Sequence, residues 1–436
     1  MNYQKELLAN IEARTAQIGI VGLGYVGLPL AVEFAEAGFC VLGVDVSAEK
    51  VAQVNGGRSY IADVPDARLA DLVAAGRLKA TTSYDELRDV DAISICVPTP
   101  LRKTGDPDMS YIIEAAQSIA QVRRRGMLIV LESTTYPGTT EEVIVPRIAG
   151  DSLALGEDVF VAYSPERIDP GNNDFTVRNT PKVVGGMTPA CSEVAKALYE
   201  SAVEQVVQVS SPTTAEMVKL LENTFRAVNI GLVNEMALMC DKLDVDVWEV
   251  IQAAASKPFG YMPFYPGPGL GGHCIPVDPH YLSWKLKTLN YNARFIELAS
   301  EINTSMPYYV LDKITEALNN LERSVRGSRV VILGVAYKRD VDDVRESPAL
   351  DILSLLRQRG ADVCYHDPHV PQLRLESDVM LRSVPFCAEL LQGAHCVVII
   401  TDHSATDWQA VRRHSRLIVD TRHVFRNKDG SHIIGL

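Results

Sequence analysis

Short apolar runs alternate with longer amphipathic stretches through the first half of the chain. The apolar runs lie at 17–22, 39–46, 92–97, 128–132 and 159–163. Such runs predict buried strands, and the helical patterns between them predict helices that cover the sheet. Strands that alternate with helices are typical of a parallel, doubly wound sheet. We therefore expect a Rossmann domain over residues 1–205.

The pattern changes after Ser211-Pro212, a pair that favours the start of a helix. From about 213 to about 243, apolar residues recur every three or four positions, which predicts one long helix. Helical patterns return at 247–255 and at 295–321. Residues 206–324 are therefore predicted to form a helical central domain.

A second alternating segment occupies residues 325–436, with expected strands at 328–334 and 361–367 around a helix at 349–359. It repeats the order of the first domain without its glycine spacing. The predicted fold class is α/β, with two Rossmann-like doubly wound domains joined by a helical central domain that contains one long helix.

Composition argues against several functional classes. The chain has 436 residues and a formal net charge of −13, and its densest basic cluster, Arg123-Arg124-Arg125, falls at an expected helix end. Nucleic acid is therefore not an expected partner. No apolar run suggests a membrane span or a signal peptide, so we expect no membrane partner and a cytoplasmic location. The eight cysteines lack metal-ligand spacing, which predicts no bound metal.

A glycine-rich turn after the first strand has the spacing of a dinucleotide-binding site. It reads Gly22-Leu23-Gly24-Tyr25-Val26-Gly27. The first glycine permits the turn, the second lets the backbone approach a pyrophosphate, and the third packs helix on strand. Asp45 closes the next strand, where a carboxylate binds a ribose 2′-hydroxyl and repels a 2′-phosphate. NAD is therefore the expected cofactor.

A second glycine-rich segment extends from Gly267 to Asp278. Its four glycines and two prolines predict a loop and exclude a helix or a regular strand. Cys274 lies inside it, with the Asp278 carboxylate four residues later, which is an arrangement for a nucleophile beside a base. A structural loop with an incidental thiol is the alternative from these residues alone.

Polar residues also mark the long helix and the ends of the strands. Lys219 and Asn223 are four residues apart, so they share one helical face among apolar neighbours. The alternative is a snorkelling lysine and a surface asparagine. Ligands of doubly wound sheets bind outside the carboxyl ends of the strands. Segments at that edge contain Pro98, Thr99, Thr134, Glu166 and Arg167.

Taken in order, these motifs resemble the UDP-glucose/GDP-mannose dehydrogenase family over nearly the whole chain. The matches are GLGYVGLP at 22–29, Pro-Thr-Pro at 98–100, Ser-Thr-Thr-Tyr-Pro-Gly at 133–138, Ser-Pro-Glu-Arg at 164–167, Lys219 with Asn223, GPGLGGHC at 267–274 with Asp278, and Ala-Tyr-Lys at 336–338 with Arg-Glu-Ser-Pro at 345–348. So many ordered matches make an incidental thiol at Cys274 untenable.

The resemblance implies a four-electron oxidation of a sugar C6 alcohol that consumes two NAD⁺. Asp278 assists deprotonation of the alcohol, the Cys274 thiolate adds to the resulting aldehyde, and a second oxidation gives a thioester that water cleaves. Lys219 and Asn223 stabilise the oxyanion. Glu166 activates the water, and Thr134 lies near the reacting sugar.

The remaining site residues also follow from the resemblance. Lys338 and Arg422 are expected at the diphosphate and uridine, and Arg345 at the cofactor pocket. Further substrate contacts are expected from Glu166, Arg167, Tyr265 and Gly271. The cofactor contacts are expected from Gly22, Gly24, Tyr25, Val26, Gly27, Asp45, Pro98, Thr99 and Thr134.

Two departures from the UDP-glucose pattern bear on the substrate. The stretch 256–265 lacks the usual arginine, and Val277 replaces a lysine before Asp278. Both resemble the branch that acts on UDP-N-acetylhexosamines. We expect UDP-N-acetylglucosamine as the substrate, for surface polysaccharide precursors, with UDP-glucose or UDP-N-acetylmannosamine as alternatives. A homodimer through the central helices is also expected.

Two other classes of protein fit parts of the pattern. Hydroxyacid dehydrogenases share the Rossmann domain and a long helix with Lys and Asn, but need neither Cys274 nor residues 328–436. A non-catalytic NAD-sensing protein has no use for Cys274, Lys219, Asn223 and Glu166 together. The number of NADH molecules formed per UDP-sugar separates the three classes: two, one or none.

Overall fold

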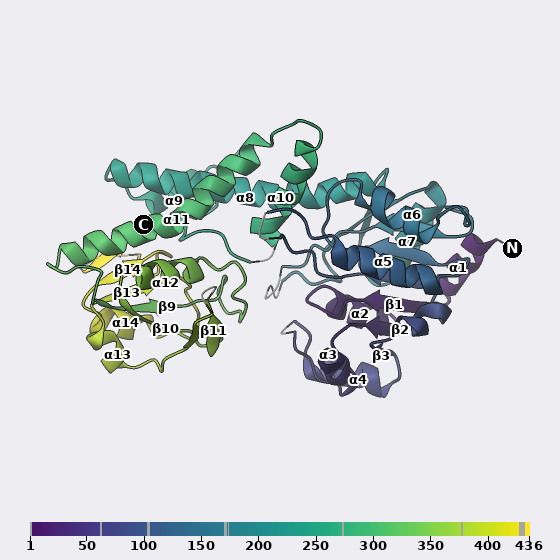
Figure 1. Ribbon diagram of the computed structural model, residues 1–436, viewed down its shortest axis with the longest axis horizontal. Helices are drawn as coiled ribbons and strands as arrows, with labels where there is room; N and C mark the ends of the chain where they lie inside the picture. The colour runs from purple at the N-terminus through teal and green to yellow at the C-terminus, as the bar shows by residue number, and fades with distance from the viewer. Residues whose placement is uncertain are drawn as a thin grey trace. The chain divides into compact units, whose positions relative to one another are not determined.

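The computed structural model describes residues 2–61, 63–102, 105–169, 172, 174–272, 274–375, 378–426 and 432–436. The chain forms two compact units, one of residues 1–222 and 280–290 and the other of residues 223–279 and 291–436 (Figure 1). The expected three-domain boundaries at 205/206 and 324/325 stay a prediction.

An eight-stranded sheet forms the centre of the first unit, in the order β3-β2-β1-β4-β5-β6-β7-β8. The strands are β1 (Gln17–Val21), β2 (Cys40–Val44), β3 (Leu78–Thr81), β4 (Ala92–Ile95), β5 (Leu128–Leu131), β6 (Phe160–Tyr163), β7 (Lys182–Gly186) and β8 (Val206–Gln208). Every pair is parallel except β6 and β7. The expected doubly wound sheet is confirmed, and the antiparallel β7 was not expected.

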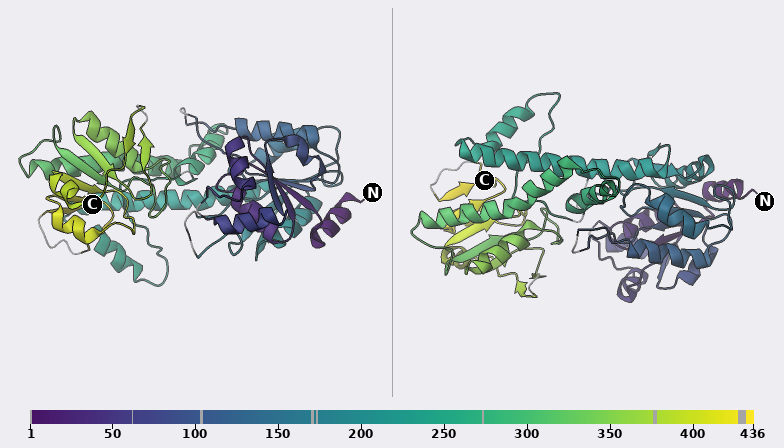
Figure 2. Two further views of the ribbon diagram at one scale, coloured as in Figure 1. Left: turned by 90° about the horizontal axis from the view of Figure 1, so that it is seen from below. Right: turned by 45° about the horizontal axis from the view of Figure 1, so that its top comes forward.

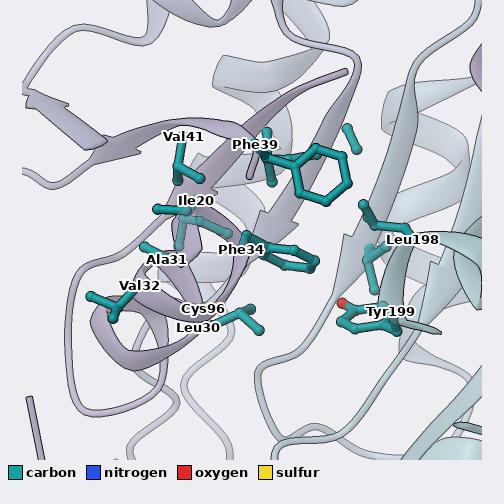
Figure 3. Packing of buried hydrophobic residues seen from close by; sticks show 14 of the residues in the cluster. Ile20, Leu30, Ala31, Val32, Phe34, Phe39, Val41, Cys96, Leu198 and Tyr199 are labelled. Carbon is teal, nitrogen blue, oxygen red and sulfur yellow. The ribbon is translucent and has the colours of Figure 1, made fainter. Parts of the chain in front are cut away.

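Helices cover both faces of this sheet, which is why β4, β5 and β6 are buried along their whole length (Figure 2, left). The helical segments are α1 (Tyr3–Glu12), α2 (Gly27–Glu36), α3 (Ala48–Asn55), α4 (Asp66–Ala74), η1 (Tyr84–Asp89), α5 (Ser110–Val122), η2 (Thr140–Ile144), α6 (Val145–Ile148) and α7 (Pro189–Glu200). On one face, Phe34 of α2 packs against Tyr199 of α7, with ring centroids 5.8 Å apart (Figure 3). The other face packs against α5 and α6.

The long helix expected from about 213 to 243 is confirmed as α8 (Pro212–Lys242). Three further helices follow it: α9 (Val247–Ala255), α10 (Cys274–Lys287) and α11 (Arg294–Asn319). Within the second unit, α11 packs its buried face on the second sheet and on α12 (Pro348–Gln358). Among the described residues, no helix has the length and apolar character needed to cross a membrane.

A five-stranded parallel sheet, ordered β10-β9-β13-β14-β15, confirms the second Rossmann-like fold. The two strands β11 and β12 form a separate antiparallel pair. The elements are β9 (Arg329–Leu333), β10 (Asp362–His366), β11 (Gln372–Arg374), β12 (Met380–Arg382), α13 (Ala388–Gly393), β13 (Cys396–Ile399), α14 (Trp408–His414), β14 (Ile418–Asp420) and β15 (Ile433–Gly435).

Asp367, directly after β10, organises the carboxyl end of this second sheet. One carboxylate oxygen accepts main-chain N–H groups of Val335 and Ala336 at 2.7 and 3.1 Å, and the other accepts those of His369 and Val370 at 2.8 and 3.1 Å. Burial alone would raise the pKa of Asp367. A hydrogen bond from the buried ring of His403 and these N–H donors outweigh burial and lower the pKa to about 2.

We predict that Asp367→Asn destabilises the second sheet at pH 7. The fall in pKa from 3.8 to about 2 corresponds to about 2 kcal/mol of stability. Because the folded pKa is depressed, this contribution is present above about pH 4 and is lost as the pH falls towards about 2. Hydrogen-exchange mass spectrometry of β9 and β10 peptides in urea, at pH 7 and pH 3, measures this contribution to stability.

Asp362→Asn, at the exposed start of β10, is the matched control. The control should change neither the protection of these peptides nor its dependence on pH. Equal protection in Asp367→Asn and in the unmodified protein would show that the carboxylate does not stabilise the sheet.

Candidate active site

The turn between β1 and α2 has the geometry of a dinucleotide-binding turn. Gly22 has φ +92°, and a Cβ there would lie 2.5 Å from the carbonyl oxygen of Cys96. A Cβ on Gly27 would lie 1.8 Å from the carbonyl oxygen of Gly22, so both positions require glycine. A Cβ on Gly24 would meet nothing within 4 Å. Protein therefore fills the space at the first and third glycines, and open space at the second allows a pyrophosphate to approach.

Asp45 fixes the same turn from the end of β2. Its carboxylate accepts the N–H groups of Leu23 and Ser47, both at 2.9 Å, and it is 7% exposed. Each oxygen retains lone pairs for a ribose hydroxyl. The ammonium of Lys50 lies 3.7 Å away on the more exposed side. The carboxylate is thus held in place where an NAD ribose is expected.

Other residues expected at the cofactor lie at the carboxyl ends of neighbouring strands. Pro98 and Thr99 follow β4, and Thr134 follows β5. Thr99 is buried, Pro98 is exposed and Thr134 is half-buried. Since β1, β4 and β5 are adjacent and parallel, these residues share one edge of the sheet with the glycine turn. Tyr25 and Val26 lie within that turn, and Tyr25 is 39% exposed.

The first unit brings Lys219 of α8 to the turn after β6. The Lys219 ammonium donates to the main-chain carbonyl of Glu166 at 2.8 Å, and both side chains are buried. The neighbouring Arg167 pairs with Glu222 at 2.6 Å and donates to the carbonyl of Pro181 at 2.7 Å. Lys219 is therefore not a surface lysine, and the guanidinium of Arg167 is engaged within the protein.

The carboxylate of Glu166 is itself held by three donors. One oxygen accepts the N–H groups of Arg167 and Ile168 at 2.6 and 2.7 Å, and the other accepts the Lys182 ammonium at 3.0 Å. Burial would raise the pKa of Glu166, but the charge and hydrogen bond of Lys182, with the two N–H donors, outweigh burial and lower it. Glu166 is therefore an ionised carboxylate at neutral pH.

Two residues behind Glu166 had no expected role. Lys182 also pairs with Glu132 at 2.6 Å, and Glu132 accepts a hydrogen bond from the Tyr199 hydroxyl. Burial raises the pKa of Glu132, and the positive charge of Lys182 opposes that rise. In the sequence, Lys182 is a single lysine at the start of an apolar strand, a feature that indicates no particular function.

In the second unit, Cys274 does not lie in a loop. The expectation that the glycine-rich segment excludes a helix as far as Asp278 was wrong, because α10 begins at Cys274. Pro276 falls in the first helical turn, where a missing N–H costs no hydrogen bond. The exposed thiol thus lies at a helix N-terminus, which favours a thiolate.

Asp278 lies one helical turn after Cys274 and shares its face of α10. Asp278 is 1% exposed and accepts a hydrogen bond from the amide of Asn223, which is 5% exposed. The alternative of a surface Asn is therefore wrong. The structure brings Asn223, Asp278 and Cys274 together within the second unit.

The glycines before Cys274 allow a close fit to the second Rossmann-like fold. A Cβ on Gly267 would lie 2.8 Å from the guanidinium of Arg422, and one on Gly271 would lie 2.7 Å from Cβ of Tyr337. The N–H of Gly272 donates to the carbonyl of Arg345 at 3.0 Å. At these positions the protein itself occupies the space beside the glycines.

Arg422 is a half-buried cation beside this segment. Burial lowers the pKa of Arg422 to about 10. The positive charge of Arg339 lowers this pKa further, and the negative charge of Asp420 opposes the fall. Its Nε donates to the carbonyl of Ile400 at 2.7 Å. A desolvated guanidinium near a second arginine is suited to an anion such as a diphosphate. The half-buried Lys338 immediately precedes Arg339.

Two further expected residues have protein partners in the second unit. Tyr265 is half-exposed and stacks on Trp248, with ring centroids 5.9 Å apart. Arg345 pairs with Asp343 of its own segment at 2.6 Å. The contact of Arg345 with the cofactor stays a prediction.

One cluster in the described part of the chain has the composition of a metal site. Ligand atoms of Asp340, His369 and His403 lie within 4.8 Å of one another. However, Nδ1 of His403 accepts the N–H of Asp340 at 3.0 Å, and its Nε2 lies 3.0 Å from Asp367. Both ring nitrogens are engaged, so the cluster has the character of a structural hydrogen-bond network.

The first unit thus contains a dinucleotide turn with a ribose-binding carboxylate, and the second contains a thiol at a helix N-terminus beside a buried carboxylate. These features define the class of an NAD-linked dehydrogenase. Comparison with known protein families gives three matches along the chain. The UDP-glucose/GDP-mannose dehydrogenase family matches with its NAD binding domain over 16–203, its central domain over 213–305 and its UDP binding domain over 331–427.

Individual relatives extend over almost the whole chain. A UDP-N-acetyl-D-mannosamine dehydrogenase from Pyrococcus horikoshii is 36% identical over 418 residues, covering 94% of this chain and 96% of the relative. An NDP-N-acetyl-D-galactosaminuronic acid dehydrogenase from Ralstonia nicotianae is 37% identical over 435 residues, covering 96% and 98%. A solved structure of a UDP-D-ManNAc dehydrogenase from Pyrococcus horikoshii superposes with a TM-score of 0.87 at 33% identity, covering 96% of this chain and 98% of that one.

The chain therefore belongs to the UDP-glucose/GDP-mannose dehydrogenase family. Its cofactor is NAD, and its activity is that of an NAD-dependent UDP-sugar dehydrogenase. The expected fold class, family and cofactor are confirmed, and the hydroxyacid dehydrogenase and non-catalytic alternatives are wrong.

We predict that Asp45→Asn narrows the preference for NAD⁺ over NADP⁺. The variant loses the charge that repels a 2′-phosphate and one charged acceptor for the ribose, so the ratio of kcat/KM values should fall by about tenfold. Initial rates with NAD⁺ and with NADP⁺ measure this ratio. Asp91→Asn is the control, because that carboxylate also accepts a main-chain N–H, from Gln17, but at the opposite end of β1. An unchanged ratio in Asp45→Asn would contradict the assignment.

Proposed function

We propose that this enzyme oxidises the C6 alcohol of a UDP-N-acetylhexosamine to the carboxylate in two successive oxidations, the second of them on a covalent adduct of Cys274. The observation that carries the proposal is the helical turn that joins Cys274 to Asp278, with Asn223 bound to the Asp278 carboxylate. The bound cofactor supplies a hydride acceptor at each step. The enzyme's own residues move protons, form a covalent bond and stabilise charge.

Each residue has a role that fits its surroundings. Asp278, buried and ionisable, takes the alcohol proton through water. The Cys274 thiolate then adds to the aldehyde carbon and forms a thiohemiacetal, which becomes a thioester on the second oxidation. Lys219 and the second N–H of Asn223 stabilise the oxyanion at that carbon. Hydrolysis of the thioester releases the acid and restores the thiol. The resemblance to the family supports a position for Thr134 near the sugar.

The UDP moiety is proposed to bind in the second unit. Arg422 offers its half-buried guanidinium for the diphosphate, and Lys338, which immediately precedes Arg339, offers a second cation. The match of residues 331–427 to a UDP binding domain supports this placement. These contacts are common to all UDP-sugars, so they supply affinity without selecting the sugar.

The relatives revise our expectation for the sugar. Their names specify N-acetylmannosamine and N-acetylgalactosaminuronic acid, which supports an N-acetylhexosamine and favours UDP-N-acetyl-D-mannosamine over the expected UDP-N-acetylglucosamine. The segment 256–265 lacks arginine and exposes Phe259, Tyr261 and Tyr265. Aromatic side chains of this kind suit an acetamido methyl group.

A homodimer through α8 is part of the proposal. The helix exposes apolar side chains at four- and seven-residue spacing, which places them along one face. These residues are Met217, Leu221, Phe225, Leu232 and Met239. An exposed apolar stripe of this kind favours burial against a second copy. The surface-polysaccharide role and the cytoplasmic location stay predictions.

We predict that Cys274→Ala abolishes acid formation, because no thiohemiacetal can form. The unmodified enzyme should form two NADH per UDP-sugar, and the Cys274→Ser variant should accumulate an ester that hydrolyses slowly. Absorbance at the NADH band and mass spectrometry of the protein measure these outcomes. Cys40→Ala, which removes another exposed thiol, is the control and should keep full turnover. Full conversion to the acid by Cys274→Ala would end the covalent scheme.

The sugar preference is tested by kcat/KM on four UDP-sugars. UDP-N-acetylmannosamine should exceed UDP-N-acetylglucosamine, UDP-N-acetylgalactosamine and UDP-glucose. Loss of the acetamido contacts should cost UDP-glucose roughly 1–3 kcal/mol, or about 10- to 200-fold. A preference for UDP-glucose would exclude the N-acetylhexosamine assignment. A preference for a different N-acetyl sugar would exclude only the configuration.

A further inference from the structure

A buried ionic network lies behind the turn that carries Glu166. The ammonium of Lys182 lies between the carboxylates of Glu132 and Glu166, at 2.6 and 3.0 Å. The Tyr199 hydroxyl donates a hydrogen bond to Glu132, and the Tyr199 ring packs against Phe34 of α2 (Figure 3). Lys182 is 3% exposed, Glu132 is 1% exposed and Tyr199 is fully buried. The network is therefore shielded from solvent.

Stability alone does not account for such a network. Burial of each ion costs several kcal/mol before pairing, and well-packed apolar residues of similar volume are often equally stable or more so. A buried set of charges can instead define one geometry, because each ion must keep its partners. The group that this geometry fixes is found by following the contacts outward from Glu166.

The contacts lead to Lys219. Lys182 and two main-chain N–H groups hold the Glu166 carboxylate, and the carbonyl of the same residue accepts the Lys219 ammonium at 2.8 Å. Arg167 adds a second connection, because it pairs with Glu222 one turn further along α8 and bonds the carbonyl of Pro181 beside Lys182. The turn is thus attached to β7 and to α8 together.

The same contacts bear on the role of Glu166. The carboxylate accepts from an ammonium and two N–H groups, which hold it in one orientation, and its water-activating role stays a prediction. The main chain of the same residue has a further task, since its carbonyl orients Lys219.

We propose that Lys182 and Glu132 are positioning residues, which fix the Glu166 turn and thereby hold the Lys219 ammonium at the reacting carbon. The inference rests on the proposed function in one respect, namely that Lys219 stabilises the oxyanion. Neither Lys182 nor Glu132 is required to touch the substrate.

The test uses the full-length enzyme with the double variant Glu132→Gln/Lys182→Met. The double variant removes one positive and one negative charge together, and the amide oxygen of the introduced glutamine keeps an acceptor for Tyr199. Displacement of Lys219 should lower kcat by roughly 10- to 100-fold. The KM for the UDP-sugar should change less than about twofold, because the lost interaction belongs to the transition state. The variant Glu200→Gln/Lys196→Met, which removes an exposed ion pair of 3.6 Å on α7, should leave both parameters unchanged.

A Lys219→Ala background separates positioning from a general loss of structure. If the network acts through Lys219, the double variant should lower kcat by less than about twofold once Lys219 is absent. An equal fall in both backgrounds, or an unchanged kcat in the Lys219-containing enzyme, would overturn the inference. If Lys219→Ala alone leaves kcat unchanged, the oxyanion role in the proposed function fails instead.

Glu132→Gln alone covers the case in which the double variant does not fold, as judged by its thermal midpoint. Lys182 then keeps Glu166 as its partner, so the fold should persist and kcat should fall by a smaller factor at constant KM. As for the double variant, this fall in kcat should be less than about twofold in the Lys219→Ala background. A fall in kcat of equal size with and without Lys219 would again overturn the inference.

Discussion

Buried carboxylates that accept main-chain N–H groups fix the turns after the parallel strands, and the site depends on them. In a parallel sheet the strands end at one edge, where the first N–H groups of each turn lack ladder partners. Asp45, Glu166, Asp367 and Asp420 each accept two or more such groups at that edge. The turns that they hold are the ones expected to carry ligands.

Asp45 and Asp367 show how the same position serves two purposes. Each closes the second strand of a Rossmann-like sheet and holds the turn after the first strand. Asp367 has His403 as an additional buried partner and accepts four N–H groups, so its carboxylate has little capacity left for a ribose. Asp45 accepts two N–H groups, so its carboxylate keeps lone pairs for a ribose hydroxyl. The difference agrees with the match of the first fold to an NAD binding domain and of the second to a UDP binding domain.

Local pattern was enough to predict the strands, the long helix and the dinucleotide turn, because each depends on residues close together in the chain. Helical structure at Cys274 was missed because glycine and proline density obscured a helix start in which Pro276 is tolerated. The ion pair of Glu132 and Lys182 joins residues 50 positions apart, and no spacing rule connects them. Lys219 was found from its helical spacing, but its partner, a main-chain carbonyl 53 residues away, has no sequence signature at all.

Helices give the proposed chemistry a rigid support that loops would not. Lys219 and Asn223 are one turn apart on α8, and Cys274 and Asp278 are one turn apart on α10, so each pair is fixed by backbone hydrogen bonds. Each α8 residue also has a buried partner, Glu166 for Lys219 and Asp278 for Asn223. A donor that is already oriented loses little entropy when charge develops on the substrate. On the inference drawn above, the Glu132–Lys182–Glu166 network serves this orientation of Lys219.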